Sequence, residues 1–142
     1  MQTTHLTIHK AIDVEAPVQR AWDTFTAGIA SWWPVTTHSI GGQRVRDVVL
    51  EPREGGLVYE VLDDGTRHEW ADVVTFDPPE CIVLNWRVNP QRAATSVEVR
   101  FGALEGGRTR VELTHSGFDA ADSYESYEAG WDPVLARFAA SS

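Results

Sequence analysis

The chain has 142 residues, of which 42% are hydrophobic and 23% are charged, and it carries a formal net charge of -9 at pH 7. This composition is ordinary for one globular domain, and no window approaches the roughly 18 consecutive apolar residues that a membrane-spanning helix needs. The acidic balance also argues against nucleic-acid and anionic-membrane partners, because binding to polyphosphates requires a concentrated positive field. We therefore expect a single domain over residues 1–142.

The N-terminal residues and the cysteine content indicate the compartment. Met1 to Thr7 lacks both the basic start and the apolar stretch of a secretory signal, and Cys81 is the only cysteine, so no disulfide can form within the chain. A cytoplasmic location is the expectation.

The first 34 residues predict one strand followed by two short helices. The apolar-rich segment Leu6–Val14 is typical of a strand. Pro17 suits the first position of a helix that extends to about Thr26 and places Trp22 and its apolar neighbours on one face. A second short helix is predicted over Ile29–Trp33, where Pro34 ends it.

From Gly41 onward the pattern predicts strands bounded by turn residues, with no helix before the C-terminus. The glycines in Asp64-Gly65 and Gly106-Gly107 permit tight hairpins, so consecutive strands should pair antiparallel. Apolar residues alternate with charged ones in the last two strands, which predicts one dry face and one wet face. The expected strands are Gln43–Leu50, Leu57–Leu62, Arg67–Phe76, Cys81–Val88, Thr95–Leu104 and Arg108–His115.

The segment Asp122–Ala139 predicts a long C-terminal helix. Its bulky residues recur at steps of three or four, which puts them on one face: Tyr124, Tyr127, Trp131, Leu135 and Phe138. Pro133 predicts a kink or short break near Ala129–Asp132. The apolar face must be covered, so we predict an α+β domain in which a curved antiparallel sheet of six to seven strands wraps around the terminal helix.

Six short motifs, in order along the chain, resemble one known family. They are Ala16-Pro17 with Trp22, Trp32-Trp33, Glu51-Pro52-Arg53-Glu54-Gly55-Gly56, Asp77-Pro78-Pro79 followed by Leu84-Asn85-Trp86, Thr114-His115-Ser116-Gly117-Phe118, and Gly130-Trp131-Asp132 with Leu135. The chain resembles the SRPBCC or START-like superfamily, and within it the activator of heat-shock protein 90 ATPase homologue family. The resemblance implies a helix-grip fold whose sheet and long helix enclose an apolar cavity. Such folds host carriers, cyclases and co-chaperone modules.

Six tryptophans in 142 residues point to either a ligand pocket or a large aromatic core. Large rigid rings make good walls for an apolar or aromatic ligand, but plain core packing explains each one as well. Trp32 and Trp33, beside Pro34, are the expected entrance. The predicted ligand-binding residues are Trp32, Trp33, Tyr59, Trp70, Trp86, His115, Tyr127 and Trp131.

Three titratable residues are candidates for acid or base chemistry. His115 shares the parity of Val111 and should face inward, either as a proton acceptor and ligand anchor or as a histidine satisfied by a neighbour. The strand parity of Glu60 and Glu69 is ambiguous; an inward carboxylate could act as acid or base. The alternative for both is a solvated carboxylate, or one paired with an arginine such as Arg44, Arg46 or Arg87.

No CxxC, HExxH, GxSxG, phosphate-binding glycine loop or dinucleotide fingerprint occurs, so no cofactor and no metal site is predicted. The leading hypothesis is a binding protein for a small apolar or aromatic molecule. The first alternative is an enzyme of the polyketide cyclase or dehydrase kind that uses His115 with Glu60 or Glu69. The second is a chaperone-associated interaction module, and a homodimer stays open.

Overall fold

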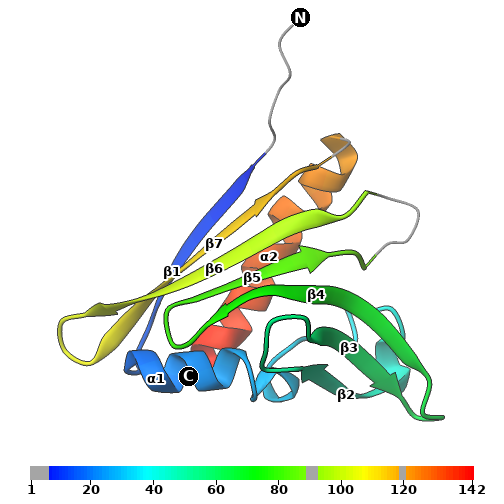
Figure 1. The fold of residues 1–142 in the computed structure, drawn as a ribbon, viewed down its shortest axis with the longest axis horizontal. Helices are drawn as coiled ribbons and strands as arrows, with labels where there is room; N and C mark the ends of the chain where they lie inside the picture. The colour runs from blue at the N-terminus through cyan, green and yellow to red at the C-terminus, as the bar shows by residue number, and fades with distance from the viewer. Residues whose placement is uncertain (1–6, 89–92, 119–120) are drawn as a thin grey trace, which may run out of the picture.

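The computed structural model describes residues 7–88, 93–118 and 121–142, with the side chains of residues 121–126 left out of the description. Seven strands form one antiparallel sheet in the order β1-β7-β6-β5-β4-β3-β2 (Figure 1). The strands are β1 (Ile8–Val14), β2 (Val45–Leu50), β3 (Leu57–Leu62), β4 (Arg67–Asp77), β5 (Cys81–Trp86), β6 (Thr95–Leu104) and β7 (Arg108–Ser116). This is the predicted curved sheet, and each expected strand is present with ends shifted by two residues or fewer.

Two α-helices and two short 3-10 turns complete the described fold. They are α1 (Val18–Phe25), η1 (Ile29–Ser31), η2 (Gly42–Arg44) and α2 (Ala121–Ser141). The helix η2 was not predicted: Gly42 has φ of +56°, and the turn it opens delays strand β2 to Val45. No described helix is long and apolar enough to cross a membrane.

The sheet is curled, and its irregularities lie in the half that contains β2 to β5. The pairing register shifts between Val45 and Asp47, between Val58 and Tyr59, and between Val73 and Thr75. Such bulges bend a strand and increase its twist. Figure 1 shows α2 running along one face of this sheet, with α1 near its C-terminal end.

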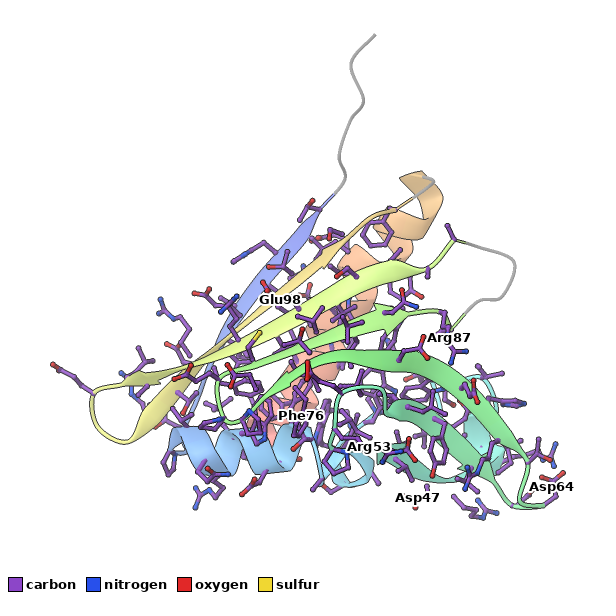
Figure 2. The ribbon with its side chains drawn as sticks, viewed as in Figure 1. Asp47, Arg53, Asp64, Phe76, Arg87 and Glu98 are labelled. Carbon is purple, nitrogen blue, oxygen red and sulfur yellow. The ribbon has the colours of Figure 1, made fainter. Side chains whose placement is uncertain are left out.

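The inner face of the sheet and α2 enclose the core, as the alternation in the last two strands predicted. Val99 and Leu113 are fully buried, whereas Arg100 and Arg110, on the opposite face, are exposed. That outer face is polar and includes Glu98 and Arg87 (Figure 2). The helix is covered on the side that the spacing indicated, with Trp131, Leu135 and Phe138 all buried. The side chain of Tyr124 lies outside the described residues.

Polar contacts fix how α2 lies on the sheet. The Lys10 ammonium on β1 bonds to Glu128 at 2.6 Å and to Asp132 at 3.1 Å, and Arg137 donates to the carbonyl oxygen of Trp32 at 2.8 Å. The hydrogen bond to Glu128 is the main reason that the pKa of Lys10 is raised. The helix continues through Pro133 without the break that the proline predicted. Buried side chains on both sides of the proline anchor the helix, so one lost backbone bond does not interrupt it.

Candidate pocket between α2 and the sheet

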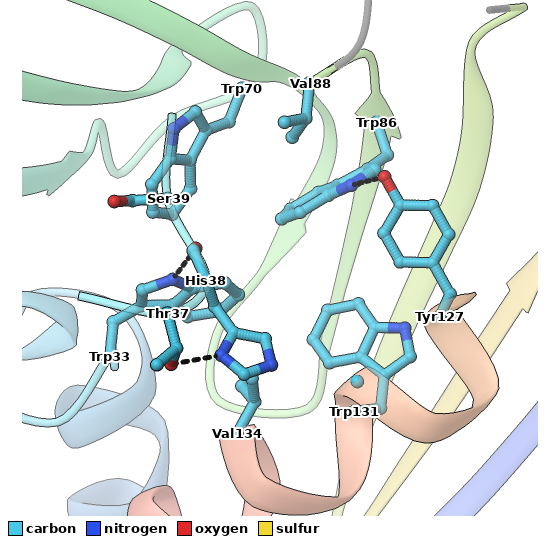
Figure 3. A pocket seen from close by; sticks show the side chains of 11 residues that line it. Trp33, Thr37, His38, Ser39, Trp70, Trp86, Val88, Tyr127, Trp131 and Val134 are labelled. Carbon is cyan, nitrogen blue, oxygen red and sulfur yellow. Dashed lines mark hydrogen bonds between the residues drawn. The ribbon is translucent and has the colours of Figure 1, made fainter. Parts of the chain in front are cut away.

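A partly open pocket of about 290 Å³ lies between α2, the ends of β4 and β5, and the loop that follows η1 (Figure 3). This volume is close to the lower end of the range for small-molecule sites, about 300–1,000 Å³. The pocket is lined by Trp33, Thr37, His38, Ser39, Trp70, Trp86, Val88, Tyr127, Gly130, Trp131 and Val134.

Four tryptophans form one continuous aromatic wall. The Trp33 ring lies 5.0 Å from the Trp70 ring, 6.2 Å from Trp86 and 6.1 Å from Trp131, measured between centroids. These separations are those of rings in direct contact. The four rings therefore present one surface to the pocket.

The indole N–H groups of this wall are all bonded within the protein. Trp33 donates to the carbonyl oxygen of His38 at 2.7 Å, Trp70 to Glu60 Oε1 at 2.7 Å, Trp86 to the Tyr127 hydroxyl oxygen at 3.2 Å, and Trp131 to His115 Nδ1 at 3.0 Å. These bonds orient the four rings, and they leave the indoles to present apolar surface to the pocket.

His115 stands behind the wall and not in it. It is fully buried, and its Nδ1 accepts the Trp131 N–H, so in the neutral ring the proton is on Nε2 and is donated to Thr95 Oγ1 at 2.6 Å. Burial lowers the pKa of His115 to about 4. The neutral imidazole thus holds Trp131 in place from the rear.

Glu60 is the second buried anchor. Its carboxylate accepts from the backbone amides of Ile40 at 2.8 Å and Gly41 at 2.6 Å, from Trp70 Nε1 at 2.7 Å and from His68 Nδ1 at 3.0 Å. Burial alone raises the pKa of Glu60, but these four bonds outweigh it and the pKa lies below its ordinary value. One side chain therefore fixes both an indole of the wall and the loop that carries His38.

Two polar side chains that line the pocket, Tyr127 and His38, keep a hydrogen-bonding group that has no partner among the described residues. The Tyr127 oxygen accepts from Trp86, and no described residue accepts the Tyr127 hydroxyl proton. Burial raises the pKa of Tyr127, opposed in part by the bond from Trp86. The His38 Nδ1 lies 2.7 Å from Thr37 Oγ1, and the Thr37 hydroxyl donates to the carbonyl of Pro34 at 3.3 Å. In the tautomer in which His38 Nδ1 donates to Thr37, Nε2 is left as an acceptor.

The structure brings together five of the eight residues that the sequence nominated for ligand binding: Trp33, Trp70, Trp86, Tyr127 and Trp131. Trp32 was expected at the entrance, but it is 1% exposed and packs in the core against Phe25 and Phe138. Tyr59 lies outside the pocket with the Arg67 guanidinium 4.4 Å from its ring centroid.

The three candidates for acid or base chemistry, Glu60, Glu69 and His115, each bond to a different set of partners. The sequence left open whether Glu60 points inward or is solvated or paired with an arginine, and it is buried and enclosed by N–H groups. Glu69 does pair with an arginine, at 2.8 Å from Arg87. Neither carboxylate lines the pocket, and His115 bonds to Trp131 and Thr95. The residues proposed for the cyclase alternative are therefore not assembled as one site.

Six lining residues were not predicted from the sequence: Thr37, His38, Ser39, Val88, Gly130 and Val134. Val134 and Gly130 share the helical spacing of Tyr127 and Trp131, so the helix periodicity contained the signal for both. No periodic pattern marks the loop that carries His38. Among the described residues, no three His, Cys, Asp or Glu side chains are grouped as a metal site.

The sequence matches one known protein family. The family model described as Activator of Hsp90 ATPase homolog 1-like protein matches residues 15–141. No curated protein matches the sequence significantly.

Three solved structures illustrate the structural likeness. The chain is 31% identical to Txn09, an anthrahydroquino-γ-pyrone synthase in complex with a compound designated SUM, with a TM-score of 0.65 and 94% of each chain covered. The Aha1 dimer from Colwellia psychrerythraea is 16% identical, with a TM-score of 0.70 and coverage of 94% of this chain and 92% of that one. PFC0360w, an HSP90 activator from Plasmodium falciparum, is 18% identical, with a TM-score of 0.63 and coverage of 89% and 88%. The last two show the fold alone. The family match over residues 15–141 and the helix-grip architecture agree with the resemblance read from the sequence, and the chain belongs to the Activator of Hsp90 ATPase homolog 1-like family.

Proposed function

We propose that this protein binds a small planar aromatic molecule against the four-indole wall of its pocket. The observation that carries the proposal is the wall itself: Trp33, Trp70, Trp86 and Trp131 line one pocket, and each has its N–H turned to a partner in the protein. Rigid rings held in this way offer contact area without the entropic cost of ordering side chains on binding.

The pocket's size and composition support a guest of two or three fused rings. A space of about 290 Å³ bounded mainly by indole rings and Val88 and Val134 favours a flat apolar body over a flexible or charged one. No Asp, Glu, Lys or Arg is among the described residues that line it, and the nearby Glu60 carboxylate is satisfied by N–H donors.

A second candidate function is enzymatic ring closure on such a guest, favoured by the 31% identity to an anthrahydroquino-γ-pyrone synthase. His38 Nε2 would take the proton from a substrate hydroxyl, the freed oxygen would attack an unsaturated carbon of the same molecule, and the imidazolium would return the proton to the product. The step is an isomerisation, so atoms and electrons balance without a co-reactant. A guest recovered unchanged after long incubation favours binding, and a cyclised guest favours this second function.

Equilibrium dialysis with 9-fluorenone, a planar tricyclic ketone, tests the binding proposal through Gly130→Leu. A Cβ added at Gly130 would lie 3.8 Å from the His38 ring, so a leucine there extends into the pocket. We expect the affinity to fall about 5- to 150-fold, because overpacking costs roughly 1–3 kcal/mol. The matched control is Ala129→Leu, which places the same side chain on the exposed face one residue earlier. Equal affinity in wild type, A129L and G130L would refute the proposal.

The oligomeric state, a chaperone partner and the cellular location also stay proposals. A homodimer is supported only by the likeness to a dimeric Aha1, and light scattering of the purified chain would test it. A chaperone partner and a cytoplasmic location rest on the family alone.

A further inference from the structure

The hydrogen-bonding groups that line the pocket are nearly all used by the protein. The four indole N–H groups have internal partners, as described above. The Ser39 hydroxyl donates to the carbonyl of Val35 and accepts the amide of Gly42, and the Thr37 hydroxyl is shared between Pro34 and His38. An aromatic guest therefore meets very few directional groups, and those few decide which guests bind.

The Tyr127 hydroxyl is the donor that remains. Its oxygen accepts the Trp86 N–H at 3.2 Å, which leaves its own hydrogen unclaimed among the described residues and polarises the O–H bond toward donation. Figure 3 shows Tyr127 extending from α2 toward Trp86 at the edge of the indole wall. A guest that lies flat on the indole wall would place the edge of its ring system against this hydroxyl.

His38 supplies the complementary group across the pocket. With Nδ1 donating to Thr37, Nε2 of the neutral ring can only accept. A guest with an acceptor oxygen at the His38 side would face a lone pair, whereas the same oxygen at Tyr127 meets a hydrogen. In this tautomer the donor of the pocket lies on α2 and its acceptor on the loop.

We propose that the guest carries a ketone or quinone oxygen on its aromatic framework, which accepts a hydrogen bond from Tyr127, and that Tyr127 sets specificity for it. This inference rests on the proposed aromatic binding function. It narrows the class of guest from any flat aromatic molecule to an aromatic ketone or quinone. A plain hydrocarbon would fill the same space and leave the Tyr127 hydroxyl desolvated without a partner.

The test compares 9-fluorenone with fluorene, which has the same ring skeleton without the oxygen. Wild type should bind 9-fluorenone about 2- to 10-fold more tightly than fluorene, the range for one net hydrogen bond. In Tyr127→Phe the ratio of the two affinities should fall to near one. Tyr59→Phe makes the same change at a tyrosine outside the pocket and should keep the wild-type ratio.

Infrared spectroscopy of the bound ketone gives a second reading, and its wild-type part does not depend on the stability of a variant. The carbonyl stretch of 9-fluorenone bound to wild type should move to lower frequency than in an apolar solvent, and Y127F should remove that shift. Equal affinities for the two probes in wild type, with no shift of the stretch, would overturn the inference while leaving aromatic binding intact. Failure of both probes to bind would overturn the proposed function, and the inference with it.

Discussion

Glu60→Gln is expected to lower the free energy of unfolding by about 2–4 kcal/mol, since it leaves buried N–H donors without an acceptor. The carboxylate accepts four bonds, two at each oxygen. A glutamine keeps one oxygen, and its amide group would face either the Gly41 amide or the Ile40 amide as a second donor. Urea unfolding followed by tryptophan emission measures the loss.

Three further variants separate the effect of this anchor from general effects of removing a glutamate or a glycine. Glu69→Gln, on the adjacent strand, breaks only a partly exposed pair with Arg87 and should cost less than about 1 kcal/mol. Gly41→Ala leaves the glutamate in place but puts a Cβ 2.9 Å from Glu60 Oε2, so it should also destabilise, whereas Gly102→Ala meets nothing within 4 Å and should not. If E60Q and E69Q cost the same, Glu60 is not the anchor described.

The stability of the protein is expected to fall as the pH drops from about 6.5 to about 4, because of His115. Burial lowers the pKa of this histidine from 6.5 to about 4, so in that window the unfolded chain binds a proton that the folded one does not. The contribution is fully present above pH 6.5 and is lost on acidification. The pKa difference corresponds to about 3 kcal/mol.

His115→Gln isolates this contribution. The difference in unfolding free energy between wild type and H115Q should shrink steadily from pH 7 to pH 4, as measured by urea unfolding at each pH. His9→Gln changes an exposed histidine of β1 and should retain the wild-type profile. A wild-type stability that is flat between pH 4 and 6.5 would mean that the folded protein binds this proton as readily as the unfolded chain, which would contradict the lowered pKa of His115.

Most of the fold was predictable because apolar residues recur periodically in its strands and in its long helix. Alternation in the segments that became β6 and β7 fixed the inner face, and steps of three and four placed Tyr127 and Trp131 on one side of α2. The turn η2 escaped prediction because its residues Gly42–Arg44 have no apolar period, and a lone glycine pair suggests a hairpin as readily as a 3-10 turn.

The site was predictable only where regular elements present its residues. Glu60 is buried on the same parity as Val58 and Leu62, but β3 carries apolar residues on both parities, so its pattern did not show which face Glu60 takes. Trp32 and Trp33 are neighbours at the end of η1, and only the packing of α2 decides that Trp32 enters the core while Trp33 lines the pocket. His38 lies on an irregular loop held by Glu60, a residue 22 positions away, so its place depended on a tertiary contact.

The most direct test of the central claim is the nuclear magnetic resonance spectrum of the six indole N–H groups during titration with 9-fluorenone. Trp33, Trp70, Trp86 and Trp131 line the pocket, whereas Trp22 and Trp32 are buried elsewhere in the core and serve as internal controls. The account predicts that the signals of the four wall tryptophans shift together and saturate, while those of Trp22 and Trp32 stay in place. Unmoved wall signals at saturating ketone, or equal shifts in all six, would contradict it.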